Sequence, residues 1–185
     1  PDVFESSEIG AKVEITDDLG FTIAYFDSEQ VRAVRDSVSG ETSEIVGLQV
    51  DGFELEVKGD INDKMSLVFG YSALDGKTSK GGEPREIPDQ MLSLFATYEV
   101  SDKFGWAVGI TQQGESNIGN DKPGLVLPEY TRVDLGAYYQ IADDLSVQMN
   151  LENLTDELYF PHSHSTHQAS VGEPLNVRLS IRMTF

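Results

Sequence analysis

Apolar and polar residues alternate with a period of two along most of this chain. The pattern is clearest near the C-terminus, where Val177, Leu179 and Ile181 alternate with Arg178 and Ser180. Such alternation is typical of β-strands that have one apolar and one polar face. No convincing helical period appears, so an all-β fold is predicted. The expected strands, about nine in number, fall at 8–16, 21–26, 52–57, 64–71, 92–98, 106–110, 130–141, 145–151 and 176–185.

The connections between the expected strands alternate between short and long. Tight polar turns alternate with long segments that are rich in Gly, Ser, Glu and Pro. This alternation predicts an antiparallel up-and-down meander with two unlike rims, one of short turns and one of long loops. The short turns fall at 16–20, 59–63, 100–105 and 141–146, and the long connections at 28–42, 73–89, 114–127 and 155–172.

Two architectures share this alternating pattern. A soluble β-sandwich buries its apolar face against a second sheet, whereas an outer-membrane barrel turns its apolar face to lipid and its polar face to the lumen. The polar face here combines glycines with charges, such as Glu54 with Glu56 and Arg132 with Asp134, which a wet lumen tolerates. Aromatic residues near the strand ends also favour a barrel, because amphipathic rings are stable at the headgroup level. They are Phe21, Tyr98, Trp106, Tyr139 and Phe185.

Composition and charge exclude several further classes of protein. The 185 residues include 32 acidic and 13 basic residues, giving a net charge of −19, and phosphates require a basic surface, so no nucleic acid partner is expected. Cysteine is absent, which removes disulfides and thiolate metal ligands. No run of about 20 apolar residues occurs, so no transmembrane helix is expected. No signal peptide is visible and the chain begins at Pro1, which indicates a processed product or a fragment.

Three motifs stand in order near the C-terminus. They read Leu-Pro-x-Tyr-x-x-x-Asp, then Asn-x-x-Asn-Leu-x-Asp-x-x-Tyr, then Gly-x-Pro leading into a last strand that ends in Phe. With the upstream segments 50–72 and 88–100, they resemble the C-terminal end of a TonB-dependent outer-membrane receptor of the siderophore subgroup. The motif residues are Leu127, Pro128, Tyr130, Asp134, Asn150, Asn153, Leu154, Asp156, Tyr159, Gly172, Glu173, Pro174 and Phe185, with Gly52, Glu54 and Gly59 upstream.

This resemblance implies a roughly 22-stranded transmembrane β-barrel with an N-terminal plug. Residues 1–185 would then be a single-domain, C-terminal barrel portion without the plug, because bacterial outer-membrane barrels close with an even number of strands. The implied function is active uptake of a ferric-siderophore complex or similar small ligand across the bacterial outer membrane. The implied partners are the lipid bilayer, the TonB system through the missing N-terminal region, and the outer-membrane assembly machinery, for which Phe185 would be a signal. A self-contained soluble β-sandwich or ligand-binding module is the alternative.

The three histidines of the chain, His162, His164 and His167, all lie in the connection 155–172. Imidazoles at this spacing suit a divalent metal ion such as Zn²⁺ or Cu²⁺. A polar loop without a metal site is the simpler interpretation, because the sequence reveals no residues that would orient the imidazoles. We therefore predict that this loop faces the cell exterior and contacts the ligand through its histidines, without a bound metal or cofactor.

No catalytic motif is evident. The paired carboxylates of the short turns and of the strand 52–57 are interpreted as solvated or lumen-lining groups, since adjacent strand residues point to opposite faces. The segment 76–83 contains Gly, Lys and Thr but lacks the spacing of a phosphate-binding loop. Enzymatic activity is therefore not expected.

Overall fold

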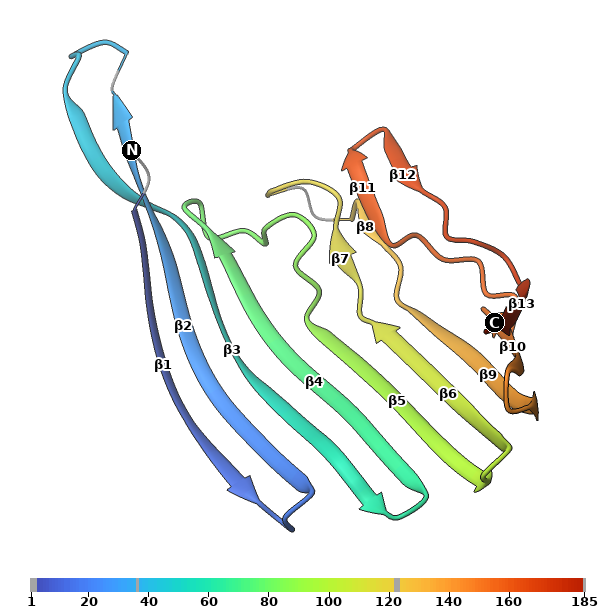
Figure 1. Cartoon of the computed structure of the whole chain (residues 1–185). Helices are drawn as coiled ribbons and strands as arrows, with labels where there is room; N and C mark the ends of the chain where they lie inside the picture. The colour runs from blue at the N-terminus through green and yellow to red at the C-terminus, as the bar shows by residue number, and fades with distance from the viewer. Residues whose placement is uncertain (1–2, 36, 122–123, 185) are drawn as a thin grey trace.

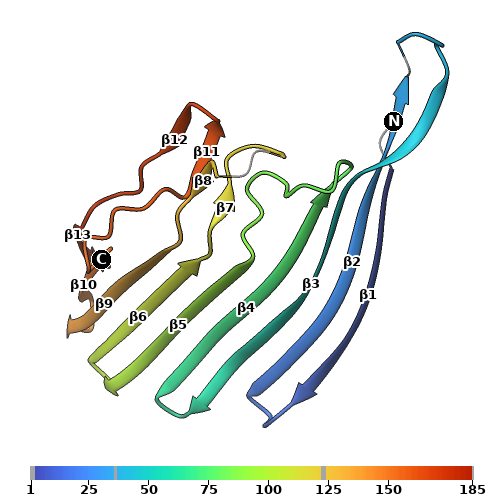
Figure 2. The same cartoon turned by 180° about the vertical axis from the view of Figure 1, so that it is seen from behind.

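A computed structural model describes residues 3–35, 37–121 and 124–184. Its body is one antiparallel sheet of nine strands in the order β1-β2-β3-β4-β5-β6-β9-β10-β13, which curves into a wall with free edges at β1 and β13 (Figures 1 and 2). The strands are β1 Val3–Glu14, β2 Leu19–Arg35, β3 Thr42–Asn62, β4 Met65–Thr78, β5 Gln90–Ser101, β6 Phe104–Gln113, β9 Tyr130–Ala142, β10 Leu145–Glu152 and β13 Asn176–Met183.

The predicted meander is confirmed. Each expected stretch overlaps one strand of the large sheet, and all neighbouring strands pair antiparallel. The described residues contain no helix long and apolar enough to cross a membrane. Short turns join the strands at one rim, and long connections rise from the other (Figure 1).

Strand register makes the apolar face continuous across the sheet. Leu55 lies opposite both Ile23 and Tyr71, so three apolar side chains meet across β2, β3 and β4. Further along, Leu135 of β9 lies opposite Val108 of β6 and Leu151 of β10, and Leu151 in turn faces Val177 of β13. The period-two pattern therefore places apolar residues on one side of every strand.

This apolar face ends at polar and aromatic residues. Near the long loops, Asp27, Asp51 and Asp75 lie opposite one another on β2, β3 and β4. Carboxylates are unfavourable in hydrocarbon, so this row bounds any lipid-facing band. Near the short turns, the rings of Tyr98 and Trp106 lie 5.7 Å apart between their centroids, as expected of an interface girdle.

The apolar face is not covered by a second sheet. Among the described residues, the buried apolar side chains are Ala96, Leu127 and Tyr159, whereas Ile181 in the apolar row remains 67% exposed. Besides the main sheet, the described part of the chain has only two-stranded pieces. A self-contained β-sandwich is therefore not favoured, because it would bury this face.

The long connections contain more strand than the apolar pattern predicts. The expected connection 28–42 is largely a continuation of β2 and β3, which form a hairpin that projects beyond the neighbouring strands (Figure 1). A hairpin that projects beyond the sheet has no apolar face that must avoid water, so its sequence loses the alternation. Two small hairpins in other connections were also not predicted: β7 Ser116–Asn117 with β8 Val126–Leu127, and β11 His162–Ser165 with β12 Gln168–Ser170.

Candidate functional site: the inner wall and the loops above it

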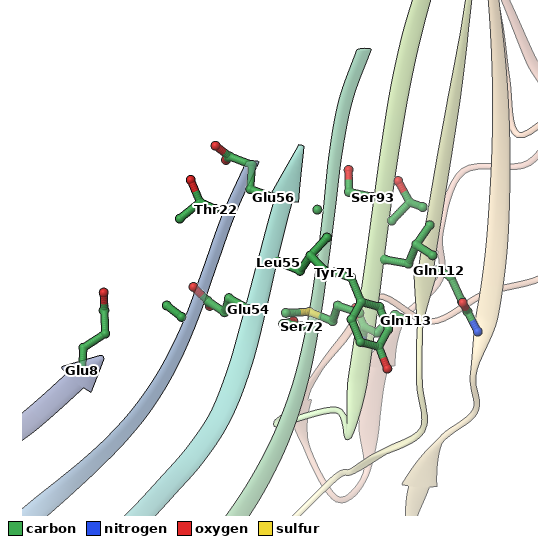
Figure 3. A pocket seen from close by; sticks show the side chains of 15 residues that line it. Glu8, Thr22, Glu54, Leu55, Glu56, Tyr71, Ser72, Ser93, Gln112 and Gln113 are labelled. Atoms are coloured by element: carbon green, nitrogen blue, oxygen red, sulfur yellow. The ribbon is translucent and has the colours of Figure 1, made fainter. Parts of the chain in front are cut away.

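The inner face of the sheet is polar and hollowed. One depression in it has a volume of about 490 Å³, and Figure 3 shows the carboxylates of Glu8, Glu54 and Glu56 projecting from β1 and β3 along it. Hydroxyl groups such as that of Ser93 continue the lining across β5. None of the described lining residues is a lysine or an arginine. The wall can therefore receive hydrogen-bond donors or positive charge.

A second hollow of about 280 Å³ lies over β6, β9 and β10. Arg132 and Asp134, predicted on the polar face, form an ion pair there at 2.7 Å between Nη2 and Oδ2. Gly109 and Gly136 line the same hollow, and their lack of side chains leaves backbone accessible to a group that packs against the wall.

The last long loop, residues 153–175, folds back over the inner face. The phenol oxygen of Tyr159 accepts a hydrogen bond from Arg132 at 3.3 Å, and its ring lies 4.7 Å from that of Tyr130. A side chain at Gly172 would meet this ring at 2.2 Å, so only glycine allows the two segments to pack. Tyr159 is buried as a result.

Asn153 fixes the root of this loop and is only 1% exposed. Its amide nitrogen donates to the carbonyls of Glu157 and Glu173, both at 2.9 Å, while its amide oxygen accepts from the Glu157 backbone N–H. The backbone N–H of Asn153 donates to Asp134 Oδ1 at 2.8 Å. Three motif residues of the sequence, Asp134, Asn153 and Glu173, therefore meet in one hydrogen-bonded cluster.

The histidines lie on the hairpin β11–β12 at the outer end of the loop. His162 and His164 belong to β11 and His167 to the connecting turn, and all three are exposed. Nε2 of His162 lies 2.9 Å from Ser170 Oγ across the hairpin. Among the described residues, no group of three or more His, Cys, Asp or Glu side chains could hold a metal ion. The predicted ligand contact stays a prediction, and Phe185 lies outside the described residues.

Ser163, between two of the histidines, contacts a different loop. It is 2% exposed, and its backbone N–H and hydroxyl both donate to Glu86 Oε1, the hydroxyl at 3.0 Å. Its carbonyl accepts from Arg85 Nη2. Sequence analysis did not single out these residues, because nothing in a local pattern marks a contact across 77 positions.

The contacts of Glu86 also change its acidity. Burial raises the pKa of this carboxyl, but the hydrogen bonds from Ser163 and the neighbouring Arg85 guanidinium outweigh burial, so the pKa falls below its ordinary value. Arg85 Nη2 lies 3.3 Å from Glu86 Oε2. The carboxylate is therefore ionised at neutral pH and able to accept all these hydrogen bonds.

Comparison with known proteins agrees with this geometry. The chain is 28% identical to the probable TonB-dependent siderophore receptor PiuA of Acinetobacter baumannii over its whole length. It superposes on the ferripyoverdine receptor of Pseudomonas aeruginosa, solved with ferripyoverdine bound, with a TM-score of 0.82, 28% identity and coverage of 99% of this chain and 27% of the receptor. The ferric-catecholate receptor Fiu of Escherichia coli shares the fold, with a TM-score of 0.86 at 23% identity over all of this chain and 28% of Fiu.

The chain spans about 27% of the length of PiuA. The family described as TonB dependent receptor-like, beta-barrel, matches residues 5–154, which is most of the chain. The match covers eight of the nine strands of the main sheet, from β1 to β10. This chain therefore belongs to the TonB-dependent receptor family and is part of the family's β-barrel.

Proposed function

We propose that this chain forms the C-terminal wall of an outer-membrane receptor that actively takes up ferric-siderophore complexes. The observation that carries the proposal is the two-sided sheet: an uncovered apolar face outside, and a polar, hollowed face inside under a folded-back loop. A lipid-embedded barrel explains both faces, because lipid covers the first and a hydrated lumen solvates the second. The relatives are receptors for transport, and we propose a transport role and no catalytic role for this chain.

The complete receptor would supply what this wall lacks. The free edges of β1 and β13 pair with further strands to close the barrel, since unpaired backbone groups cannot remain in hydrocarbon. A plug outside this chain fills the lumen and connects it to TonB. The terminal Phe185 acts as a signal for the outer-membrane assembly machinery. Deleting it from the complete receptor should lower the amount inserted into the membrane, and normal insertion would contradict this role.

The loop histidines line the entrance for the ligand. His162, His164 and His167 are exposed on the hairpin β11–β12, and the ring nitrogens of imidazole can form hydrogen bonds with a ligand. Replacing all three by alanine should lower siderophore affinity modestly in the complete receptor. Calorimetry should detect no Zn²⁺ or Cu²⁺ binding in either form; binding that the substitutions abolish would instead make the hairpin a metal site.

Uptake of iron tests the proposed function directly. A strain that lacks the complete receptor should lose uptake of one class of radioactive ferric siderophore, and the restored gene should recover it. Recovery should fail when TonB is absent, because the transport is active. If no ferric siderophore of the hydroxamate, catecholate or mixed classes depends on the receptor, the assignment of siderophores is wrong.

A further inference from the structure

The last long loop is hydrogen-bonded to the rest of the molecule at two places, its root and its outer end. At its root, every hydrogen-bonding atom of the Asn153 side-chain amide has a partner. At its outer end, the hairpin β11–β12 is held through Ser163 by a segment of another loop, residues 83–87, which we call the strap. The root is held by bonds within the loop and to the strand β9 below it, whereas the outer end is held by a neighbouring loop.

The strap holds Ser163 from both sides. Glu86 accepts the backbone N–H and the hydroxyl of Ser163, and Arg85 donates to the Ser163 carbonyl. These bonds engage all hydrogen-bonding groups of one residue, so the hairpin cannot shift without breaking several of them. Because Ser163 is almost fully buried, broken bonds would not be replaced by water until the segments separate.

The strap is itself anchored to the third long loop. The backbone N–H of Glu86 donates to the carbonyl of Asn117 at 2.9 Å, and the backbone N–H of Arg85 donates to Asn120 Oδ1 at 2.7 Å. Arg85 and Asn117 also form a parallel β-bridge. The connections after β4, β6 and β10 are therefore tied together through the strap.

One atom of this arrangement opposes closure. Arg85 Nε is buried and has no hydrogen-bond partner, and a buried donor without a partner is penalised relative to one in water. Separation of the strap from the hairpin returns this donor to solvent and relieves the penalty. The contact around Ser163 therefore contains one donor without a partner among the described residues, whereas the side-chain amide of Asn153 is fully hydrogen-bonded.

We propose that Arg85 and Glu86 act as a latch that holds the hairpin β11–β12 against the neighbouring long loops at the rim of the inner wall, and that the hairpin opens by release of Ser163 while the loop root stays in place. The proposal rests on the proposed function, in which these loops guard the entrance of a receptor. The opening moves His162, His164 and His167 together, because all three belong to the hairpin. The entrance then widens at the hairpin and not at the root of the loop.

Hydrogen exchange measured by mass spectrometry on the complete receptor, without ligand, tests the latch. The variants are Glu86→Ala and the conservative Glu86→Gln, with Glu115→Gln as a control that removes a carboxylate from an exposed position of the third loop. Peptides that cover 161–170 should exchange at least tenfold faster in Glu86→Ala and less so in Glu86→Gln. Peptides that cover 153–157 should keep their wild-type rate in every variant.

Three results would overturn the latch: unchanged exchange of the hairpin in Glu86→Ala, equal acceleration in Glu115→Gln, or simultaneous opening of the root. If Glu86→Ala does not assemble, as judged by heat-modifiable migration on gels, Glu86→Gln decides, because its amide keeps the shape and loses the charge. The exchange rates need no siderophore, so a failure of the uptake experiment leaves this test intact and a failure of the latch leaves the proposed function intact.

Discussion

At the residue scale, the motif positions owe their identity to contacts that the sequence pattern does not reveal. Asn153 has a positive φ of 53°, a conformation that asparagine tolerates better than most residues. Its side chain also satisfies backbone groups of Glu157 and Glu173. Gly172 is required by the ring of Tyr159. The motifs were recognisable from their order and spacing, but their convergence on one cluster required the fold.

Two substitutions at Asn153 should separate the stability that comes from its side-chain hydrogen bonds from the stability that comes from its tolerance of a positive φ. Asn153→Gly removes the side-chain hydrogen bonds but accepts the positive φ, and unpaired buried groups cost about 1–3 kcal/mol each. Asn153→Ala should destabilise the loop root by about a further 1 kcal/mol, because alanine is strained in this conformation. Local opening free energies from hydrogen exchange of the complete receptor would measure both, with exposed Thr155→Ala as control. Equal effects of Gly and Ala would show that the backbone conformation contributes nothing.

Glu86 should make the hairpin contact sensitive to acid. Its pKa is lowered in the folded state, so its stabilising effect is present above the ordinary pKa of 4.5 and is lost as the pH falls below that value. The facing groups are the cation of Arg85 and the uncharged Ser163 and Asn117. A nitroxide at Thr166 should therefore become more mobile below about pH 4.5.

The control for this titration is Glu86→Gln, which cannot gain a proton at position 86. Its electron paramagnetic resonance spectrum should show a hairpin that is partly released at neutral pH, more mobile than in the wild type, with little further change on acidification. A wild-type transition that persists unchanged in Glu86→Gln would mean that another acidic group of the loops controls the hairpin.

At the scale of elements, the sequence predicted strands well where they carry the apolar face, and poorly where they extend beyond it into the long connections. Strand β13 and its partner β10 were evident because one face must avoid water and the other must avoid lipid. The outer parts of β2 and β3, and the hairpin β11–β12, carry no such constraint and were missed. Their strand pairing depends on backbone hydrogen bonds and loop contacts, which leave little periodic trace in a sequence.

Arginine substitutions on the two faces of the C-terminal hairpin should differ in cost. Leu179, opposite Met149 in register, lies on the apolar face, whereas Gln148 lies on the inner face. Leu179→Arg should destabilise the complete barrel by about 2–4 kcal/mol if it lies near the bilayer midplane. Gln148→Arg should cost much less, because the lumen solvates the charge. Equal losses in denaturant unfolding from lipid vesicles would contradict the assignment of the faces.

At the scale of the whole molecule, the alternating apolar pattern and the unequal rims together determine an orientation. The short turns would face the periplasm and the long, interlocked loops the cell exterior, as is usual for bacterial barrels. The fold class was predictable because every transmembrane strand repeats the same physical requirement. The latch between loops was not, because it depends on single contacts such as that of Glu86 with Ser163, far apart in sequence.

Cysteine labelling in intact cells tests this orientation. The chain contains no cysteine, so single cysteines can be introduced into a complete receptor that is otherwise free of them. Thr166→Cys, in the turn of the hairpin β11–β12, should react with a maleimide that cannot cross the outer membrane. Asp143→Cys, in the short turn between β9 and β10, should react only after lysis. The reverse pattern would invert every strand of the sheet and move the latch, the histidines and the folded-back loop to the periplasmic side, where none of them could meet an incoming ligand.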